Sequence, residues 1–170
     1  MCVCCVCISA NDCQQESTTA ASSCSVQTPL IAGLADSALS ASSARNAGSQ
    51  PSGSRLHSDA FWRPASEAVG EFVQADLGAL KRIEAIATQG HPAHARWVTS
   101  YKFAHSVDDV TYDYVMNADD GERVFSGNSD SNTVVVNDVS PSIVARYVRL
   151  YPQTYQQLIS VRWEVYGCSH

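Results

Sequence analysis

Charged residues are scarce in this sequence, and long apolar runs are absent. Asp, Glu, Lys and Arg make up only 16% of the 170 residues. No apolar stretch approaches the roughly 20 residues that a membrane-spanning helix needs. The net charge of −6 at pH 7 argues against nucleic acid or an anionic membrane as an electrostatically driven partner. The length suffices for one domain with a sizeable core, but it is short for two.

Motifs of enzymes and of N-glycosylation are also missing. The chain has no Gly-x-Ser-x-Gly, no His-Glu-x-x-His and no Asn-x-Ser/Thr sequon. The pair His91 and His94 lacks a third nearby metal ligand. The acidic residues 108–109 and 117–122 are typical of solvated hairpin ends rather than of an EF-hand loop. We therefore expect no catalytic activity, no bound metal site and no cofactor, with a structural calcium in a loop as the alternative left open.

The cysteines are distributed unevenly. Five of the seven lie within the first 13 residues, and none lies between Cys24 and Cys168. Two isolated cysteines around such a stretch indicate one disulfide that joins the ends of a domain in an oxidising compartment. In the chain-entropy model, a closed loop of this length contributes roughly 4–5 kcal/mol to stability. Metal binding by this pair is disfavoured, because neither has a second Cys or His nearby at ligand spacing.

The first ten residues, MCVCCVCISA, admit three interpretations. They are a short or clipped signal peptide, a cysteine cluster that links subunits into a disulfide-bonded oligomer, or a metal-binding cluster without an evident second ligand group. The Ser-, Thr- and Gln-rich residues that follow show no periodicity. We therefore expect a signal-like, cysteine-rich flexible leader over residues 1–23, a folded domain over 24–168, and a tail of residues 169–170.

Alternation of apolar and polar residues predicts a series of short β-strands. Val73, Ala75 and Leu77 alternate with polar neighbours, and Gly78 then predicts a turn before the next strand. The other expected strands cover residues 82–88, 97–105, 111–116, 133–137, 146–151 and 160–166. Turn signals at close spacing and few helical patterns predict an all-β sandwich.

Seven sequence motifs occur in an order that belongs to a known family. They are SASS (40–43), FVQADLG (72–78), IATQG (86–90), WVTSYKF (97–103), FSGN (125–128), ARYVRLYP (145–152) and RWEVYGC (162–168). From Cys24 to Cys168 the chain resembles the discoidin domain, the coagulation factor V/VIII C-type family. The resemblance implies a jelly-roll-like antiparallel β-sandwich of the galactose-binding-domain-like type. It also implies joined terminal cysteines and a ligand site on loops at one end.

Two branches of this family are nearest in sequence character. The WVTSYK and NTVV segments are similar to the discoidin lectins. The VFSGNSD segment and the cysteine-rich N-terminus are similar to retinoschisin-type members, which implies disulfide-linked oligomers. Members of the family bind phospholipid, collagen, other glycoproteins or galactose-type sugars, so the fold alone leaves the ligand open.

Three loops correspond to the binding end of the family: residues 45–55, 62–70 and 90–97. The tips of the first and third loops carry Asn, Gln, Ser, Pro, His and small residues. At roughly 25 cal/mol per Å² such tips gain little from burial in lipid, and unaided arginines bind phosphates weakly. Membrane insertion is therefore disfavoured.

The polar inventory of these loops favours a carbohydrate ligand. A pyranose has hydroxyls on its rim and a C–H face, so its site needs planar hydrogen-bonding groups beside an aromatic ring. The candidate ligand residues are Asn46, Gln50, His57, Asp59, Trp62, His91, His94, Arg96 and Tyr155. Plainer alternatives are a core or loop anchor for Trp62 and merely exposed loop positions for the two histidines of the third loop. Arg96 is the first choice, because it presents a fork of donors at the base of a loop.

The sequence thus predicts a secreted or cell-surface binding module that recognises extracellular carbohydrate or glycoproteins and supports cell adhesion or recognition. Two other functions remain in competition: peripheral binding to phosphatidylserine membranes, and binding to collagen or another matrix protein.

Overall fold

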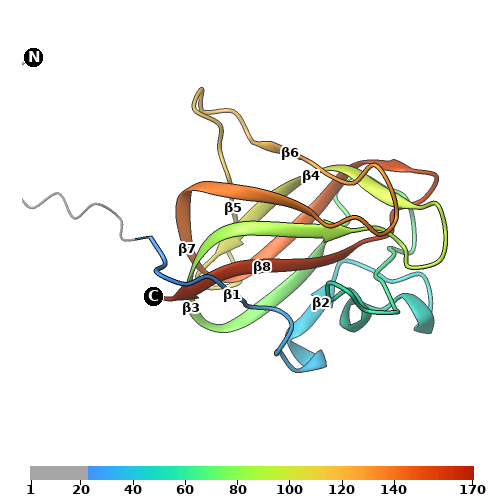
Figure 1. Ribbon diagram of the computed structural model, residues 1–170, viewed down its shortest axis with the longest axis horizontal. Helices are drawn as coiled ribbons and strands as arrows, with labels where there is room; N and C mark the ends of the chain where they lie inside the picture. The colour runs from blue at the N-terminus through green and yellow to red at the C-terminus, as the bar shows by residue number, and fades with distance from the viewer. Residues whose placement is uncertain (1–22) are drawn as a thin grey trace, which may run out of the picture.

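Two long strands, β3 (Val73–Gln89) and β7 (Val135–Gln156), run through the architecture seen in Figure 1. The computed structural model describes residues 23–170, so the predictions for the signal-like leader and its cysteine cluster lie outside the described residues. The remaining elements are β1 (Thr28–Pro29), β2 (Leu39–Ala41), β4 (Trp97–Ser106), β5 (Asp113–Tyr114), β6 (Val124–Ser126), β8 (Arg162–Ser169), and the 3-10 turns η1 (Asp36–Ala38), η2 (Ala47–Ser49) and η3 (Pro51–Gly53).

β3 and β7 each contribute to both layers of the sandwich. The first part of β3 pairs with β2 and with the second part of β7, which continues beside β4. The second part of β3 pairs with β8 and with the first part of β7. All these pairs are antiparallel, and the hydrogen-bonded order is β1-β8-β3-β7-β4-β5, with β2 beside β3 and β6 beside β4. The predicted all-β sandwich is therefore confirmed.

Two pairs of expected strands are single strands in the structure. Gly78 has a φ of 77° and lies within a register shift between Asp76 and Lys81, so β3 bends there without reversing. Residues 133–137 and 146–151 likewise fall within or beside β7. An irregularity in a strand interrupts the two-residue alternation in the same way as a turn, so the sequence pattern divides one bent strand into two.

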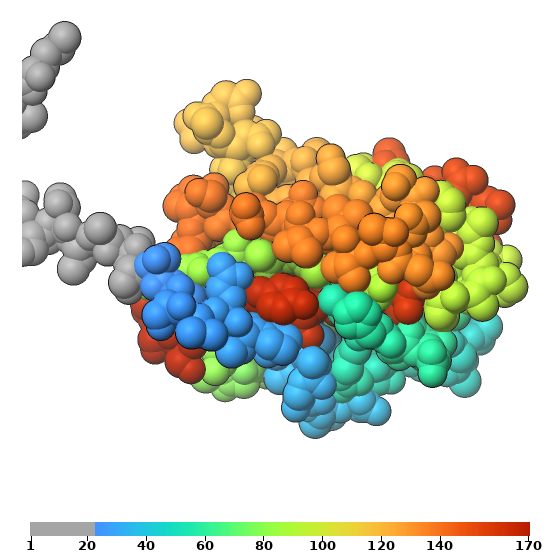
Figure 2. All heavy atoms as spheres, viewed as in Figure 1, coloured from blue at the N-terminus to red at the C-terminus, as the bar shows by residue number. Residues whose placement is uncertain are grey.

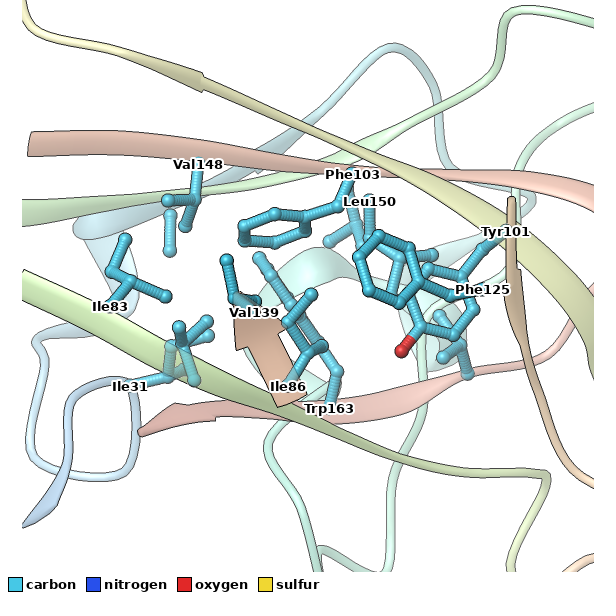
Figure 3. Close-up of a cluster of buried hydrophobic side chains, with 14 of the residues drawn as sticks. Ile31, Ile83, Ile86, Tyr101, Phe103, Phe125, Val139, Val148, Leu150 and Trp163 are labelled. Atoms are coloured by element: carbon cyan, nitrogen blue, oxygen red, sulfur yellow. The ribbon is translucent and has the colours of Figure 1, made fainter. Parts of the chain in front are cut away.

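The core lies between the two layers, as Figure 3 shows. Tyr101 and Phe125 stack with ring centroids 5.4 Å apart, and the Tyr101 hydroxyl accepts a hydrogen bond from Asn137 Nδ2 at 3.1 Å. Burial raises the pKa of Tyr101, so this phenol stays neutral. The predicted inward face of the first strand is confirmed, since Val73, Ala75 and Leu77 are all buried.

β8 is buried on both faces, unlike the half-exposed strand that its alternation suggests. Its inner face carries Trp163 into the core. Glu164, on the other face, is 2% exposed, and its carboxylate accepts backbone N–H groups of Leu30, Ile31 and Ala32 at 2.6–3.1 Å. The N-terminal segment therefore covers β8. In Figure 2 the middle of β8 is visible only as a small red patch between the blue segment and the teal loop.

A disulfide joins Cys24 to Cys168, as the sequence predicts, with the two Cα atoms 5.8 Å apart. The Cys24 amide also donates to Glu84 Oε1 at 2.7 Å, which ties the segment to β3. Both ends of the described chain therefore lie at one end of the elongated sandwich (Figure 1). Within the described residues, no helix has the length and apolar character of a membrane span.

Candidate functional site

Four connecting segments gather at the end of the sandwich opposite the disulfide, and we call this the loop end. They are residues 42–72, 90–96, 127–134 and 157–161, coloured from teal through orange to red in Figure 1. Every candidate ligand residue of the sequence lies in or next to these segments. The contacts of these candidate residues show which of them lie on the same surface.

Arg162 ties three of these segments together. Its guanidinium donates to the carbonyl oxygens of Gly90 at 2.7 Å, Ser58 at 3.0 Å and Ser131 at 3.0 Å. It also donates to the side-chain oxygen of Asn132 at 3.0 Å, and the residue is only 4% exposed. Burial lowers the pKa of Arg162, while the charge of Asp59 raises it. An arginine remains protonated in proteins, so a positive charge lies beneath the loop end with four neutral acceptors around it.

Gln89 fixes the position of His57. Its side-chain oxygen accepts the His57 N–H at 2.9 Å, and its amide donates to the Asn132 carbonyl at 2.6 Å. His57 has a φ of 65°, a left-handed conformation that is uncommon for a residue with a Cβ. The amide contact holds this turn while the side chains of His57 and Asp59 stay exposed.

His91 supports the loop that it begins. Its ring is 7% exposed and lies 4.0 Å from the Phe61 ring and 4.5 Å from the His94 ring, measured between centroids. Its Nδ1 accepts the N–H groups of Ala93 at 2.9 Å and His94 at 3.2 Å. Burial lowers the pKa of His91 to about 4, and the positive charges around it act in the same direction. The imidazole is thus neutral, and its Nδ1 already accepts two hydrogen bonds. His91 therefore stabilises the loop, and His94 is the exposed histidine.

Arg96 lies at the base of the same loop and is half-buried. Its backbone N–H donates to the His94 carbonyl and its own carbonyl accepts the His91 N–H, both at 2.8 Å. Its Nε is buried and has no hydrogen-bond partner among the described residues. Among the other arginines of the loop end, Arg55 pairs with Asp36 at 2.8 Å and Arg63 with Glu67 at 3.1 Å, whereas Arg45 donates only to the Ala65 carbonyl. No side-chain hydrogen bond or ion pair of Arg96 occurs within residues 23–170, and because its Nε is buried, only the terminal nitrogens of this half-buried side chain can meet an external acceptor.

Trp62 is an anchor of the core, which corrects its inclusion among the ligand residues. The residue has no exposed surface, and its Nε1 donates to the Ser43 carbonyl at 2.9 Å. Its backbone pairs with Val161. No face of the indole is open to a sugar ring.

Asn46 and Gln50 are exposed but belong to a separate part of the loop end. The Asn46 side chain accepts the Gly48 N–H at 3.0 Å and so caps η2, and the Gln50 amide donates to the Asn46 carbonyl at 2.7 Å. Their segment contacts Arg63, whose N–H donates to the Ser49 carbonyl at 3.3 Å. These contacts run toward residues 62–70 and not toward Arg162.

Tyr155 lines a cleft of about 210 Å³ at the edge of the loop end. The other lining residues are Glu67, Ala68, Val69, Pro152, Gln153 and Ile159. Tyr155 is 37% exposed. It pairs with Val98, the second residue of β4. Val69 is 97% exposed and forms an apolar tip on the second loop, unlike the polar tips of the first and third loops.

Five of the nine predicted ligand residues therefore lie around Arg162: His57, Asp59, His91, His94 and Arg96. The sequence does not indicate Arg162 and Gln89 as site residues. Both occupy polar positions of β-strands, and the alternation of apolar and polar residues assigns such positions to solvent. Among residues 23–170, no three His, Cys, Asp or Glu side chains converge as a metal site. A structural calcium stays an untested prediction.

Comparison with known proteins places the chain among similar sequences. Residues 38–165 match the family model described as F5/8 type C domain. Discoidin-2 of Dictyostelium discoideum is 35% identical over 114 residues, which are 67% of this chain and 43% of that protein. Lactadherin of Rattus norvegicus is 38% identical over 109 residues, which are 63% of this chain and 25% of that protein. The chain thus spans less than half the length of these relatives.

Solved structures show the same architecture. Discoidin II from Dictyostelium discoideum superposes with a TM-score of 0.74 at 28% identity, covering 86% of this chain and 60% of that one. The family 32 CBM from C. perfringens NanJ, in complex with galactose, superposes with a TM-score of 0.64 and covers 84% of this chain and 100% of that one. At 16% identity, this second likeness shows the fold alone.

Proposed function

The chain belongs to the F5/8 type C domain family, a family of carbohydrate- or lipid-binding modules, and from this premise we propose that it binds extracellular carbohydrate or glycoproteins through its loop end. In this proposal it acts as a secreted or cell-surface module in adhesion or recognition. The disulfide supports an oxidising compartment, where such bonds persist.

The available guanidinium of Arg96 beside exposed polar side chains carries the proposal. His94 lies on the same loop, and the exposed side chains of His57 and Asp59 supply further donors and acceptors near Arg162. The tilted rings of Phe61, His91 and His94 form a short series of planar groups in the same place. Directional hydrogen bonds beside ring faces suit the hydroxyl rim and C–H face of a pyranose.

The backbone of this surface is already held in place. Arg162 and Gln89 fix three loops through neutral backbone acceptors, so little loop ordering remains to oppose binding. Galactose is bound by the family 32 CBM from C. perfringens NanJ, which has a similar fold. Which sugar this chain binds depends on the side chains of its own loop end.

A glycan array with the full chain tests the proposal, run with and without calcium. We expect binding to a subset of glycans, and a loss of at least ~10-fold in affinity in Arg96→Met, because a charge-assisted hydrogen bond is removed. Arg82→Met, which removes the same charge at the opposite end, serves as the control. Binding to no glycan, or equal binding by both variants, would contradict the proposal.

A phospholipid surface is the second candidate, favoured by one observation. Val69 on the second loop is 97% exposed. It lies two residues after Glu67, which forms an ion pair with Arg63. Burying a valine contributes only about 1.5 kcal/mol, which is too little for stable anchoring by itself. Flotation with phosphatidylserine vesicles separates the two functions: Val69→Asp abolishes vesicle binding if lipid is the ligand and leaves glycan binding unchanged if sugar is.

A further inference from the structure

We propose that Trp97 is the aromatic platform of the loop end, on which the C–H face of a pyranose stacks. This inference rests on the proposed function and narrows its ligand from carbohydrate or glycoprotein to the sugar ring itself. It gives Trp97 the part that the sequence suggests for Trp62, whose indole is enclosed by the core. Trp97 is the first residue of β4 and directly follows Arg96.

Trp97 is the one of the three tryptophans that the core does not use. Trp62 and Trp163 have no exposed surface, and their Nε1 atoms donate to the Ser43 carbonyl and to Ser54 Oγ. Trp97 is half-buried, and it belongs neither to the hydrophobic core cluster nor to the apolar side chains that pack against that cluster. Filling the core therefore does not explain a large aromatic ring at this position.

The indole of Trp97 is also without a stacking partner. Among residues 23–170, no aromatic ring and no cation stacks on it, whereas Phe61 and His91 are engaged with other rings. Its Nε1 donates no hydrogen bond to these residues and is not one of their buried unpaired atoms, so this N–H faces solvent. A ligand can therefore cover the ring while one of its hydroxyls accepts from the indole.

The backbone around Trp97 fixes where the ring lies. Successive residues of a strand point to opposite faces, and Val98 is 1% exposed in the core, so Trp97 points away from the core. A Cβ added to Gly90 would lie 2.7 Å from the Trp97 Cβ. The base of the indole is therefore packed against the start of the third loop, and the ring needs little ordering when a ligand binds.

Polar groups surround this position on the neighbouring strand. Gln156 of β7 is exposed and lies directly opposite Trp97, so the two Cβ atoms are about 5 Å apart. Two residues earlier, the Thr154 hydroxyl forms hydrogen bonds with the hydroxyls of Thr99 and Ser100, both at 2.6 Å. A ring face with an amide and hydroxyls beside it suits the C–H face and the hydroxyl rim of one sugar.

Tryptophan fluorescence tests this placement directly, because the other two tryptophans are fully buried. The full chain is quenched with acrylamide, alone and saturated with the glycan that binds best on the array. We expect the sugar to protect Trp97, so that quenching falls toward that of Trp97→Phe, which retains only the buried tryptophans. Unchanged quenching at saturation, with glycan binding intact, overturns this inference and leaves the proposed function standing.

Affinities from titration calorimetry connect the protection to the ring. Trp97→Leu keeps apolar bulk without a ring face and should lower affinity at least ~10-fold, whereas Trp97→Phe should keep most of it. Tyr114→Leu, which removes a half-buried ring at the far end of β4, is the control and should bind like the wild type. Circular dichroism checks the fold of each variant. Equal affinity in Trp97→Leu and the control overturns this inference alone, and binding of no glycan overturns the proposed function as well.

Discussion

Glu164 is a buried carboxylate whose partners are backbone amides. Besides three amides of the N-terminal segment, it accepts its neighbour's N–H, that of Val165, at 2.9 Å. Glu164→Gln keeps the shape but loses the charge and turns a donor toward donors. We expect the free energy of unfolding to fall by about 2–3 kcal/mol in urea denaturation. Glu122→Gln, which breaks a surface pair with Lys102, should change it by less than about 1 kcal/mol.

His91 should make stability depend on pH. Its pKa is about 4 in the folded chain and 6.5 when unperturbed, so the unfolded form takes up the proton first as pH falls. Stability is therefore lost between pH 6.5 and about 4, and the loss is complete below that window. His91→Asn retains an acceptor for the Ala93 and His94 amides but cannot titrate. Thermal unfolding from pH 4 to 7 should show a shallower slope for this variant; parallel curves would refute the assignment.

At the scale of single residues, the sequence indicates which side chains can bind a ligand more reliably than it indicates which side chains are buried. Arg96 and His94 could be selected because loop positions expose polar groups. Arg162 and Glu164 could not, since polar positions of an alternating strand are normally assigned to water. Both are buried because irregular segments cover that face of β8, and the backbone groups of those segments need partners. No local pattern records such long-range coverage.

Where β3 passes into the third loop, Gly90 allows a close approach of two backbones. A Cβ at this position would lie 2.6 Å from the Arg96 carbonyl oxygen and 3.1 Å from the Ser131 Cα. Gly90→Ala should therefore cost about 1–3 kcal/mol of stability, measured as a lower urea midpoint. Gly33→Ala is the control, because nothing lies within 4 Å of its added Cβ. A Gly90→Ala midpoint equal to that of the control would show that the loop base yields freely.

Element types follow from the sequence, but continuity of strands does not. The alternation of residues 73–77 and 97–105 correctly predicts buried strand faces. A bend at Gly78 and an irregular middle in β7 hide the fact that each of these strands belongs to both layers. Whether a strand continues through an irregularity depends on its pairing with strands far along the chain, so the residues of the strand itself do not determine it.

At the scale of the domain described by residues 23–170, a disulfide joins Cys24 to Cys168, which are 144 residues apart. Replacing both with serine should lower the free energy of unfolding by about 4–5 kcal/mol in the chain-entropy model. The measurement is urea denaturation of the full chain. Because the bond lies at the end opposite the ligand loops, glycan affinity of the folded double variant should equal that of the wild type. A stability change below about 1 kcal/mol would show that the surrounding hydrogen bonds close the domain by themselves.

The separation of the disulfide from the loop end also sets how copies can be used together. A bead, a fusion partner or a second copy attached beside the disulfide leaves the loops facing outward. Several such copies on one support would meet a glycan-coated surface at the same time. Rebinding within that array raises the effective concentration of each site, so a module with weak single contacts gains avidity without any change in its loops.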